Sequence, residues 1–231
     1  MKKTVSIHQP NFLPWLGFFY KIIKSDVFIF LDDVQYVKRS FISRNKIKTQ
    51  SGEQYIRLPI HQKGKYKQSI LDCKLCEKKQ SVDKLVKVIQ ANYGKSKYFG
   101  DHFESFEAVL NEETHDLVDV NISLVMWVLK IIEVSVDIKR SSELEGVYGI
   151  STERLISICK SVEADSYLSG FGGNNYQDKD MFDDSGVELV ITDFEHPVYS
   201  QLWGEFIPNL SIIDLIFNYG KDSKDIILNI K

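Results

Sequence analysis

Thr4-Val5-Ser6-Ile7, a short β-branched run near the start of the chain, decides the fold together with the two segments that follow it. Gly17-Phe18-Phe19-Tyr20-Lys21-Ile22-Ile23-Lys24 suits a helix, and Val27-Phe28-Ile29-Phe30-Leu31 is a continuous apolar run, typical of a strand buried on both faces. The order predicts a strand, helix and strand unit. Asp32 and Asp33 come directly after the second strand, at the edge where open α/β sheets bind their ligands.

A second alternation of helices and strands closes the chain. Its elements are expected as helices over 151–162, 180–185 and 210–217 and as strands over 166–169 and 188–192. The middle is less regular, with expected helices over 81–93, 99–110 and 117–133 and strands over 54–60, 70–75 and 136–139. We therefore predict an α/β fold with a Rossmann-like layered sheet flanked by helices. Residues 1–231 would form one domain, with an irregular α+β insertion over about residues 50–115.

Composition excludes several classes of protein. With 231 residues, 43% of them hydrophobic and 26% charged, the chain matches a globular protein. The N-terminal segment lacks a signal-peptide pattern, and the longest apolar stretches fall far short of the roughly 20 residues of a membrane span. Three cysteines in such a chain predict reduced thiols and a cytoplasmic location. Cys73 and Cys76 form one isolated C-x-x-C without further ligands, so no metal site is predicted.

Basic residues are concentrated in one part of the chain. Between Lys38 and Gln68 there are nine Lys and Arg against one acid, a local net charge of +8 in a chain whose net charge is −3. Such asymmetry favours an anionic small-molecule ligand, or equally a solvated face of strands and loops. Nucleic acid is not an expected partner, because the isoelectric point is about 6.0 and no nucleic-acid-binding motif is present.

The densest group of polar residues is His8-Gln9-Pro10-Asn11-Phe12-Leu13-Pro14-Trp15, between the first strand and its helix. Two prolines restrict the backbone, so His8, Gln9 and Asn11 would lose little entropy on binding a ligand. The alternative is a rigid connector with His8 hydrogen-bonded in the core. The position after a strand favours a binding role.

Three further segments carry candidate chemistry. Asp32 and Asp33 suit a general base, a sugar hydroxyl or Mg²⁺, and Arg44 suits a bidentate phosphate contact, unless they only form salt bridges. The loop Ser169-Gly170-Phe171-Gly172-Gly173-Asn174-Asn175-Tyr176 is either an anion-binding nest or a tight connector, and it is not a Walker loop. Near the C-terminus, His196 could pair with an acid for proton transfer.

The order of these motifs resembles one known family. His8-Gln9-Pro10-x-Phe12-Leu13-Pro14-Trp15-x-Gly17 is followed by Asp32-Asp33-Val34-Gln35-Tyr36, Arg44-Asn45, Tyr167-Leu168-Ser169-Gly170, His196-Pro197-x-Tyr199-x-Gln201 and Ser211-x-x-Asp214-x-x-Phe217-Asn218. With these motifs, which span nearly the whole chain, it resembles the WbqC-like proteins of bacterial O-antigen and other surface-polysaccharide gene clusters. The resemblance implies a role in polysaccharide assembly, and transfer of glycine or another amino acid onto a sugar has been suggested for one member.

We therefore expect a transferase that modifies a nucleotide-linked or lipid-linked sugar. Its catalytic groups would be drawn from His8, Asp32, Asp33 and His196. The residues expected to bind substrate are Gln9, Asn11, Trp15, Gln35, Arg44, Asn45, Ser169, Gly170, Tyr199 and Gln201. No cofactor follows from the sequence. The rival interpretation is a non-catalytic protein that binds a glycan precursor or organises the pathway.

Overall fold

A computed structural model describes residues 2–65, 67–175 and 177–229. The chain divides into two compact units, and each is assembled from three separate segments. The sheet unit consists of Met1–Gln9, Gly17–Asp33 and Val136–Glu195, and the hairpin unit consists of Pro10–Leu16, Val34–Ser135 and His196–Lys231. The segment over about residues 50–115, expected as an insertion, lies within the hairpin unit. The single domain expected from the sequence stays a prediction, and each unit is described by itself.

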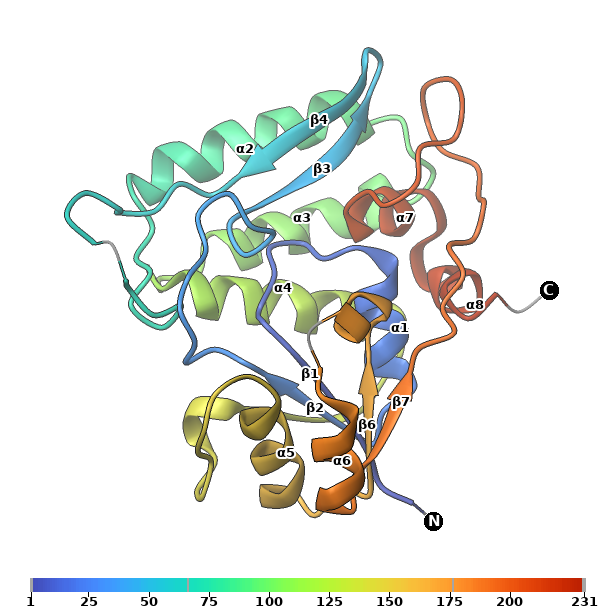
Figure 1. Ribbon diagram of the computed structural model, residues 1–231. Coiled ribbons are helices and arrows are strands. Elements are labelled where there is room, and N and C mark those ends of the chain that lie inside the picture. The colour runs from blue at the N-terminus through green and yellow to red at the C-terminus, as the bar shows by residue number, and fades with distance from the viewer. Residues whose placement is uncertain (1, 66, 176, 230–231) are drawn as a thin grey trace. The chain divides into compact units, whose positions relative to one another are not determined.

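The sheet unit contains a five-stranded parallel sheet (Figure 1). Its strands are β1 (Thr4–His8), β2 (Val27–Phe30), β5 (Asp137–Arg140), β6 (Ser166–Ser169) and β7 (Glu188–Ile191), in the order β5-β2-β1-β6-β7. Val5 pairs with Val27 on one side of β1 and with Tyr167 on the other. This arrangement confirms the predicted α/β class, and β2 is buried along its whole length as its apolar run predicts.

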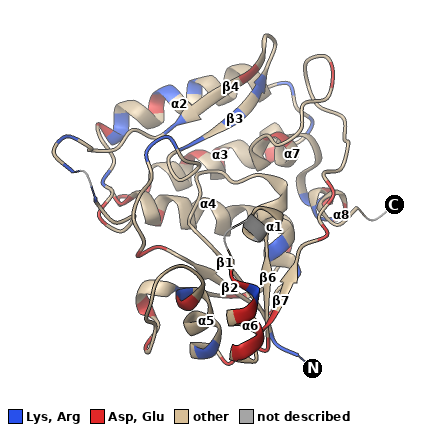
Figure 2. Ribbon diagram, viewed as in Figure 1, with Lys and Arg blue, Asp and Glu red and all other residues tan. Residues whose placement is uncertain are grey.

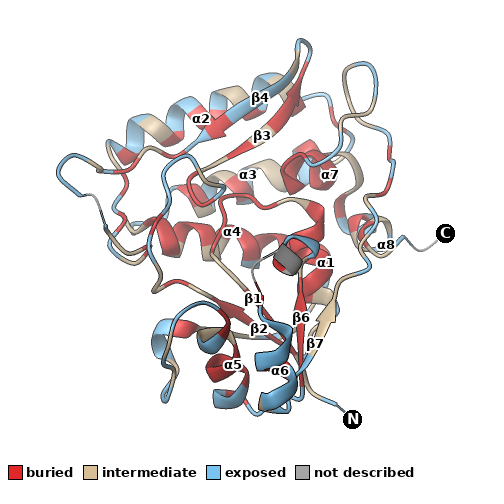
Figure 3. Ribbon diagram, in the orientation of Figure 1, coloured by how far each residue is buried: buried red, intermediate tan, exposed pale blue. Residues whose placement is uncertain are grey.

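Helices cover both faces of this sheet. Val5, Ile7, Val27 and Ile29 pack on one face against residues of α5 (Ser151–Ser161) and α6 (Lys179–Ser185), including Ile158 and Phe182. On the opposite face, Phe18 of α1 (Leu16–Ile23) lies with its ring centroid 5.2 Å from that of Phe28. Two short 3-10 helices, η1 (Ser141–Glu143) and η2 (Phe171–Asn175), follow β5 and β6. Figure 3 shows the resulting burial along the central strands.

The hairpin unit combines one antiparallel hairpin with helices. The hairpin is formed by β3 (Arg44–Thr49) and β4 (Gly52–Arg57), and it turns at Gly52, whose φ of 104° favours glycine. Its helices are α2 (Lys78–Tyr93), α3 (Phe99–Leu110), α4 (Leu117–Ile131), α7 (Ile212–Tyr219), η3 (Gly220–Asp222) and α8 (Ser223–Ile227). Among the described residues, no helix has both the length and the apolar character that crossing a membrane requires.

The hairpin unit also corrects two expectations from the sequence. Residues 70–75, expected as a strand, instead form turns with isolated bridges at Lys74 and Leu75. Strand β3 was not expected, because Arg44-Asn45-Lys46-Ile47-Lys48-Thr49 carries mostly polar side chains and lacks the apolar alternation of a half-buried strand. Its pairing with β4 and the burial of Asn45 and Lys48 come from tertiary contacts.

Candidate functional site

The strand order of the sheet unit locates a point where the chain changes direction. From β1 the chain adds β2 and β5 on one side, and it then returns to add β6 and β7 on the other side. The two loops that leave β1 and β6 at their carboxyl ends therefore run in opposite directions. In open α/β sheets, ligands bind in the crevice at such a switch point. Four residues predicted from the sequence, His8, Gln9, Ser169 and Gly170, lie at these two strand ends.

His8 is held in one tautomer at the end of β1. Its Nδ1 lies 2.9 Å from the carbonyl oxygen of Gln9, and because a carbonyl only accepts, Nδ1 carries the proton and donates. The ring also contacts Phe18 edge to face, with centroids 4.9 Å apart. Burial, together with the positive charge of Lys21, lowers the pKa of His8 to about 3. The imidazole is therefore neutral near pH 7, with Nε2 as a hydrogen-bond acceptor.

Lys21 is the residue at this switch point that the sequence prediction missed. It lies on the second turn of α1, one turn after Phe18, on the side of the helix that faces the sheet, and only 5% of it is exposed. Burial lowers the pKa of its ammonium group to about 8. A Cβ placed on Gly170 would lie 4.0 Å from Lys21 Nζ, so the loop after β6 passes beside the ammonium group. The sequence signal that could have identified Lys21 is its position on the apolar side of the predicted helix.

The loop after β6 folds back closely on its strand. Ser169 is buried and its Oγ donates to the carbonyl oxygen of Gly170 over 3.2 Å. A Cβ on Gly173 would collide with Ser169 Oγ and with the side chain of Gln177, so any larger residue there requires both side chains to move. Tyr176, which ends the glycine-rich loop predicted from the sequence, lies outside the described residues.

The tandem acids after β2 are bound by basic side chains. Asp32 is fully buried, and it accepts from Arg140 Nε over 2.6 Å and from Ser142 N over 3.0 Å. Asp33 forms an ion pair with Arg154 and lies 2.6 Å from the hydroxyl of Ser141. The two carboxylates thereby hold η1 and α5 against the end of β2. This arrangement agrees with the salt-bridge alternative for these acids, and their predicted catalytic role stays a prediction.

Cys73 and Cys76, the C-x-x-C of the sequence, stand apart from any larger group of metal-binding side chains in the described part of the chain. No group of three or more His, Cys, Asp or Glu side chains within residues 2–65, 67–175 and 177–229 could hold an ion. Cys73 is buried with a free thiol, and burial raises its pKa to about 11, while Cys76 is half-buried and also free. The pair therefore lacks the further ligands of a zinc site.

The hairpin unit contains a strongly basic cavity, which we call the arginine pocket. It has a volume of about 520 Å³ and is lined by Tyr36, Arg39, Ser43, Arg44, Tyr55, Arg57, Leu58, Pro59, Ile60 and Gln62. Arg44 and Arg57 lie directly opposite each other in the β3–β4 ladder, and the guanidinium of Arg44 lies 4.4 Å from the centroid of the Tyr55 ring. None of these lining residues is an acid. Figure 2 shows basic residues on this hairpin and on the loop before it.

Two arginines directly opposite each other repel, because like charges on cross-strand neighbours destabilise a sheet. Among the described residues, neither Arg44 nor Arg57 has a carboxylate within ion-pairing distance. An anion with two or more acceptor oxygens would relieve this repulsion and match the planar donors of arginine. The pocket is therefore suited to a phosphate or pyrophosphate group, as Arg44 was predicted to be.

Other residues predicted to bind substrate connect segments of the hairpin unit. The side-chain amide of Asn45 donates to the carbonyl oxygen of Leu13 over 2.6 Å, which fixes the proline-containing segment that carries Asn11. Asn11 itself is buried. Gln35 is exposed and forms an isolated bridge with Ser69. Asn45 is thus a support for the segment, whereas Gln35 is accessible.

His196 lies in an aromatic stack. Its ring is nearly parallel to that of Trp15, with centroids 6.4 Å apart. Its Nδ1 donates to the carbonyl oxygen of Pro197 over 2.9 Å, and its Nε2 accepts from the backbone N–H of Asn209 over 3.0 Å. Burial lowers the pKa of His196. Both ring nitrogens are therefore bound by the backbone, and the proton-transfer role expected from the sequence stays a prediction.

Tyr199 and Gln201 belong to a buried polar cluster around Asp214. Tyr93 donates to Asp214 Oδ2 over 3.0 Å, and Lys48 Nζ donates to Gln201 Oε1 over 3.1 Å. Asp214 is fully buried, and burial raises its pKa to about 6. These contacts join the hairpin, α2, α7 and the segment after His196, so the cluster supports the fold of this unit.

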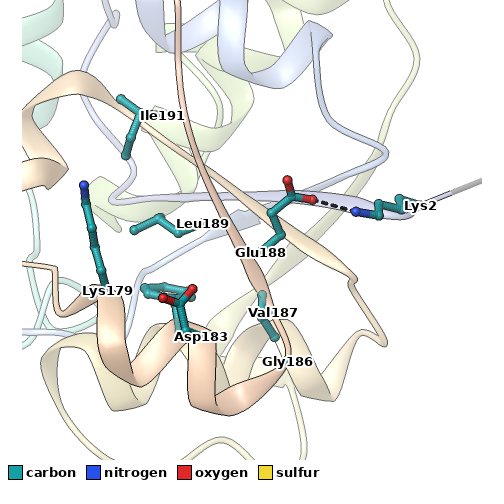
Figure 4. Close-up of a pocket in the computed structure, with 9 residues that line it drawn as sticks. Lys2, Lys179, Asp183, Gly186, Val187, Glu188, Leu189 and Ile191 are labelled. Atoms are coloured by element: carbon teal, nitrogen blue, oxygen red, sulfur yellow. Dashed lines mark hydrogen bonds and ion pairs between the residues drawn. The ribbon is translucent and has the colours of Figure 1, made fainter.

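A further hollow lies beside the edge strand β7 and α6 (Figure 4). It has a volume of about 470 Å³, and Lys179 and Asp183 of α6 line it together with the start of β7. Glu188, the first residue of β7, is paired with Lys2 over 2.9 Å. The hollow lies along the edge strand β7, from the turn before the strand to Ile191, and away from the switch point between β1 and β6, so we do not assign the function to it.

The sequence was also compared with those of known proteins and matches a described family. Residues 9–226 match the sequence pattern described as the WbqC-like protein family. An uncharacterized protein of Mycobacterium tuberculosis (strain ATCC 25618 / H37Rv), Rv1507c, is 33% identical over 225 residues, which cover 96% of each chain. No solved structure matches the chain significantly.

Proposed function

The chain belongs to the WbqC-like protein family, and from this premise we propose that it is a cytoplasmic transferase of bacterial surface-polysaccharide (O-antigen) synthesis. Its substrate would be a nucleotide-linked or lipid-linked sugar, and the transferred group would be an acyl group such as glycyl. The observation that supports this proposal is the arginine pocket, in which three guanidinium groups have no acid among the lining residues.

The chemistry of the pocket fits the phosphates of such a substrate. A sugar joined to a nucleotide or a lipid through pyrophosphate presents several oxygens within a short distance, and Arg44 and Arg57 offer planar donors from adjacent strands. The remaining wall contains Leu58, Pro59 and Ile60, which could contact the less polar parts of a sugar or a base. A volume of about 520 Å³ lies within the range of small-molecule sites.

Within the sheet unit, the group suited to act on an accepting hydroxyl or amine is His8. With Nδ1 bound to Gln9, its Nε2 can accept a hydrogen bond from the hydroxyl or amine that attacks the acyl carbon. The new bond would form between the acceptor and the acyl carbon, the bond to the leaving group would break, and the acceptor's proton would pass to that leaving group. We assign Asp32 and Asp33 to positioning, because Arg140 and Arg154 bind them.

A nucleotide sugar tests the phosphate assignment. We would measure the binding of UDP-glucose by calorimetry to the wild type, to Arg44→Ala, and to Lys87→Ala as a control that removes an exposed cation on α2. Loss of a charge-assisted contact of about 1.5–3 kcal/mol predicts roughly 10- to 100-fold weaker binding for Arg44→Ala. Lys87→Ala should bind as the wild type does. Equal affinities for the wild type and Arg44→Ala would rule out the phosphate assignment.

A second candidate function is a non-catalytic protein that binds a glycan precursor. It is favoured by the ion pairs of Asp32 and Asp33 and by the backbone bonds to both ring nitrogens of His196. The two functions differ in their response to His8→Gln, which keeps hydrogen-bonding groups at the end of β1. In a bacterium that lacks its own copy, a transferase requires His8 to restore the surface polysaccharide. A binding protein with His8→Gln would restore it as the wild type does.

A further inference from the structure

We propose that the carboxyl ends of β1 and β6 form a second anion site, in which Lys21 binds the oxygen of a carboxylate or phosphate group. This inference concerns the sheet unit alone, and it does not rest on the arginine pocket or on the proposed transferase. The ligand would be a small molecule carrying an oxyanion, with a neighbouring donor group directed to His8 Nε2.

Lys21 carries its charge on a buried side chain that has no partner within the described residues. Lysine is almost never fully buried unless it is paired, because removing an ammonium group from water is costly. Lys21 is 95% buried, yet within residues 2–65, 67–175 and 177–229 its Nζ forms no hydrogen bond or ion pair, and Nζ is not among the fully enclosed atoms, so a small ligand can reach it. The burial-lowered pKa of about 8 still leaves the group mostly protonated at pH 7. A folded protein that keeps such a charge is suited to receive an anion there.

The surroundings of Lys21 include a neutral hydrogen-bond acceptor, His8. The positive charge of Lys21 helps to lower the pKa of His8, so the two side chains are near each other and His8 is neutral. Its Nδ1 is occupied by Gln9, so Nε2 can accept from a hydroxyl or ammonium group of a ligand whose oxyanion is bound by Lys21. A bare oxyanion would therefore make only the contact with Lys21, and a small molecule that carries both groups would make two contacts.

Lys21 also lies at the point of the sheet where ligands of open α/β folds bind. Lys21 projects from the first helix after β1, and Gly170 is the first residue after β6, so the two flank the switch point of the sheet. Gly170 does not adopt a positive φ, and an added Cβ would meet Lys21 Nζ at 4.0 Å, an ordinary contact distance. A side chain can therefore be introduced there without backbone strain. This property allows the site to be occupied by a tethered carboxylate.

The test uses the full-length protein with Arg44→Ala and Arg57→Ala, so that the arginine pocket does not contribute. Inorganic phosphate and acetate serve as probes, and binding is measured by calorimetry and by the shift in melting temperature. We expect saturable binding of at least one probe, weakened at least tenfold by Lys21→Met. Lys24→Met changes an exposed lysine that directly follows the same helix, and as the matched control it should bind the probe as the Arg44→Ala, Arg57→Ala protein does. Binding of phosphate without acetate assigns a phosphate site, and the reverse assigns a carboxylate site.

Gly170→Asp supplies the second variant, with Gly170→Asn as its neutral control. The aspartate should pair with Lys21, raise the melting temperature and abolish binding of the probe, whereas the asparagine should do none of these. The proposal is overturned if neither probe binds to the Arg44→Ala, Arg57→Ala protein. It is also overturned if adding Lys21→Met or Gly170→Asp to that protein leaves its binding of the probe unchanged. A failure of the proposed phosphate binding in the arginine pocket is detected separately, because UDP-glucose would then bind equally well to the wild type and to Arg44→Ala.

Discussion

Replacing Lys21 by methionine should stabilise the free protein, which is the reverse of the usual effect of changing a buried residue. The pKa of Lys21 falls from its ordinary 10.5 to about 8 on folding, because burial disfavours the charged form. At about 1.4 kcal/mol for each pKa unit, the folded protein bears a cost of about 3 kcal/mol whenever Lys21 is charged in both states. Methionine has a similar shape and bears no such cost.

The pH dependence gives this prediction its sign. Below pH 8 the lysine is protonated in both states and the full cost is present. Between pH 8 and pH 10.5 the unfolded chain holds the proton and the folded protein has released it, so the wild type gains stability as the pH rises. Lys21→Met should therefore be about 3 kcal/mol more stable at pH 7, and this difference should shrink toward zero by about pH 10.5.

Equilibrium unfolding in urea, in buffers without phosphate or carboxylate, measures this difference at several pH values. Tyr93 and Tyr199, whose pKa values are raised by burial, begin to release their protons near pH 10 only in the unfolded chain, but they are common to both proteins and cancel in the comparison. Lys24→Met should show almost no change at any pH, because Lys24 is exposed. A Lys21→Met variant that is less stable than the wild type, or a difference that is independent of pH, would show that the ammonium group is paired in the folded protein.

Two further predictions concern the buried carboxylates. Asp32→Asn removes the buried carboxylate that Arg140 contacts at the end of β2, so the free energy of unfolding should fall by about 3–5 kcal/mol in urea titrations; a change below about 1 kcal/mol would contradict a structural role. The raised pKa of Asp214, about 6 against 3.8, contributes stability at low pH that is lost as the pH rises through 6. Unfolding at pH 4 and pH 7 should therefore show the wild type losing about 3 kcal/mol relative to Asp214→Asn, and a constant difference would refute the raised pKa.

The sequence predicted the sheet unit well because its signals are local. The run over residues 27–31 is apolar at every position, and the β-branched run before His8 is followed by a helical stripe that contains Phe18. Strand β3 could not be found in this way. Its polar residues become buried only where Lys48 meets a segment that follows about 150 residues later in the chain, and local alternation carries no information about such contacts.

The candidate sites were predictable to different degrees for the same reason. His8, Ser169 and Gly170 could be placed because they directly follow strands, and the fold fixes where strand ends lie. The partners of Asp32 and Asp33 are more than 100 residues away, so the sequence left the choice between chemistry and salt bridge open. Lys21 was missed because a helical lysine is normally solvated, and only the tertiary packing shows its burial.

Because each unit is assembled from three separate segments, neither can be completed while much of the chain is still being synthesised. Strand β1 is made first, but its neighbour β6 begins at Ser166, so one edge of β1 stays unpaired until that segment leaves the ribosome. Such high contact order predicts slow folding, and the nascent chain would expose an apolar strand edge that chaperones recognise. A chain that terminates before residue 166 should accordingly aggregate instead of forming a smaller folded protein.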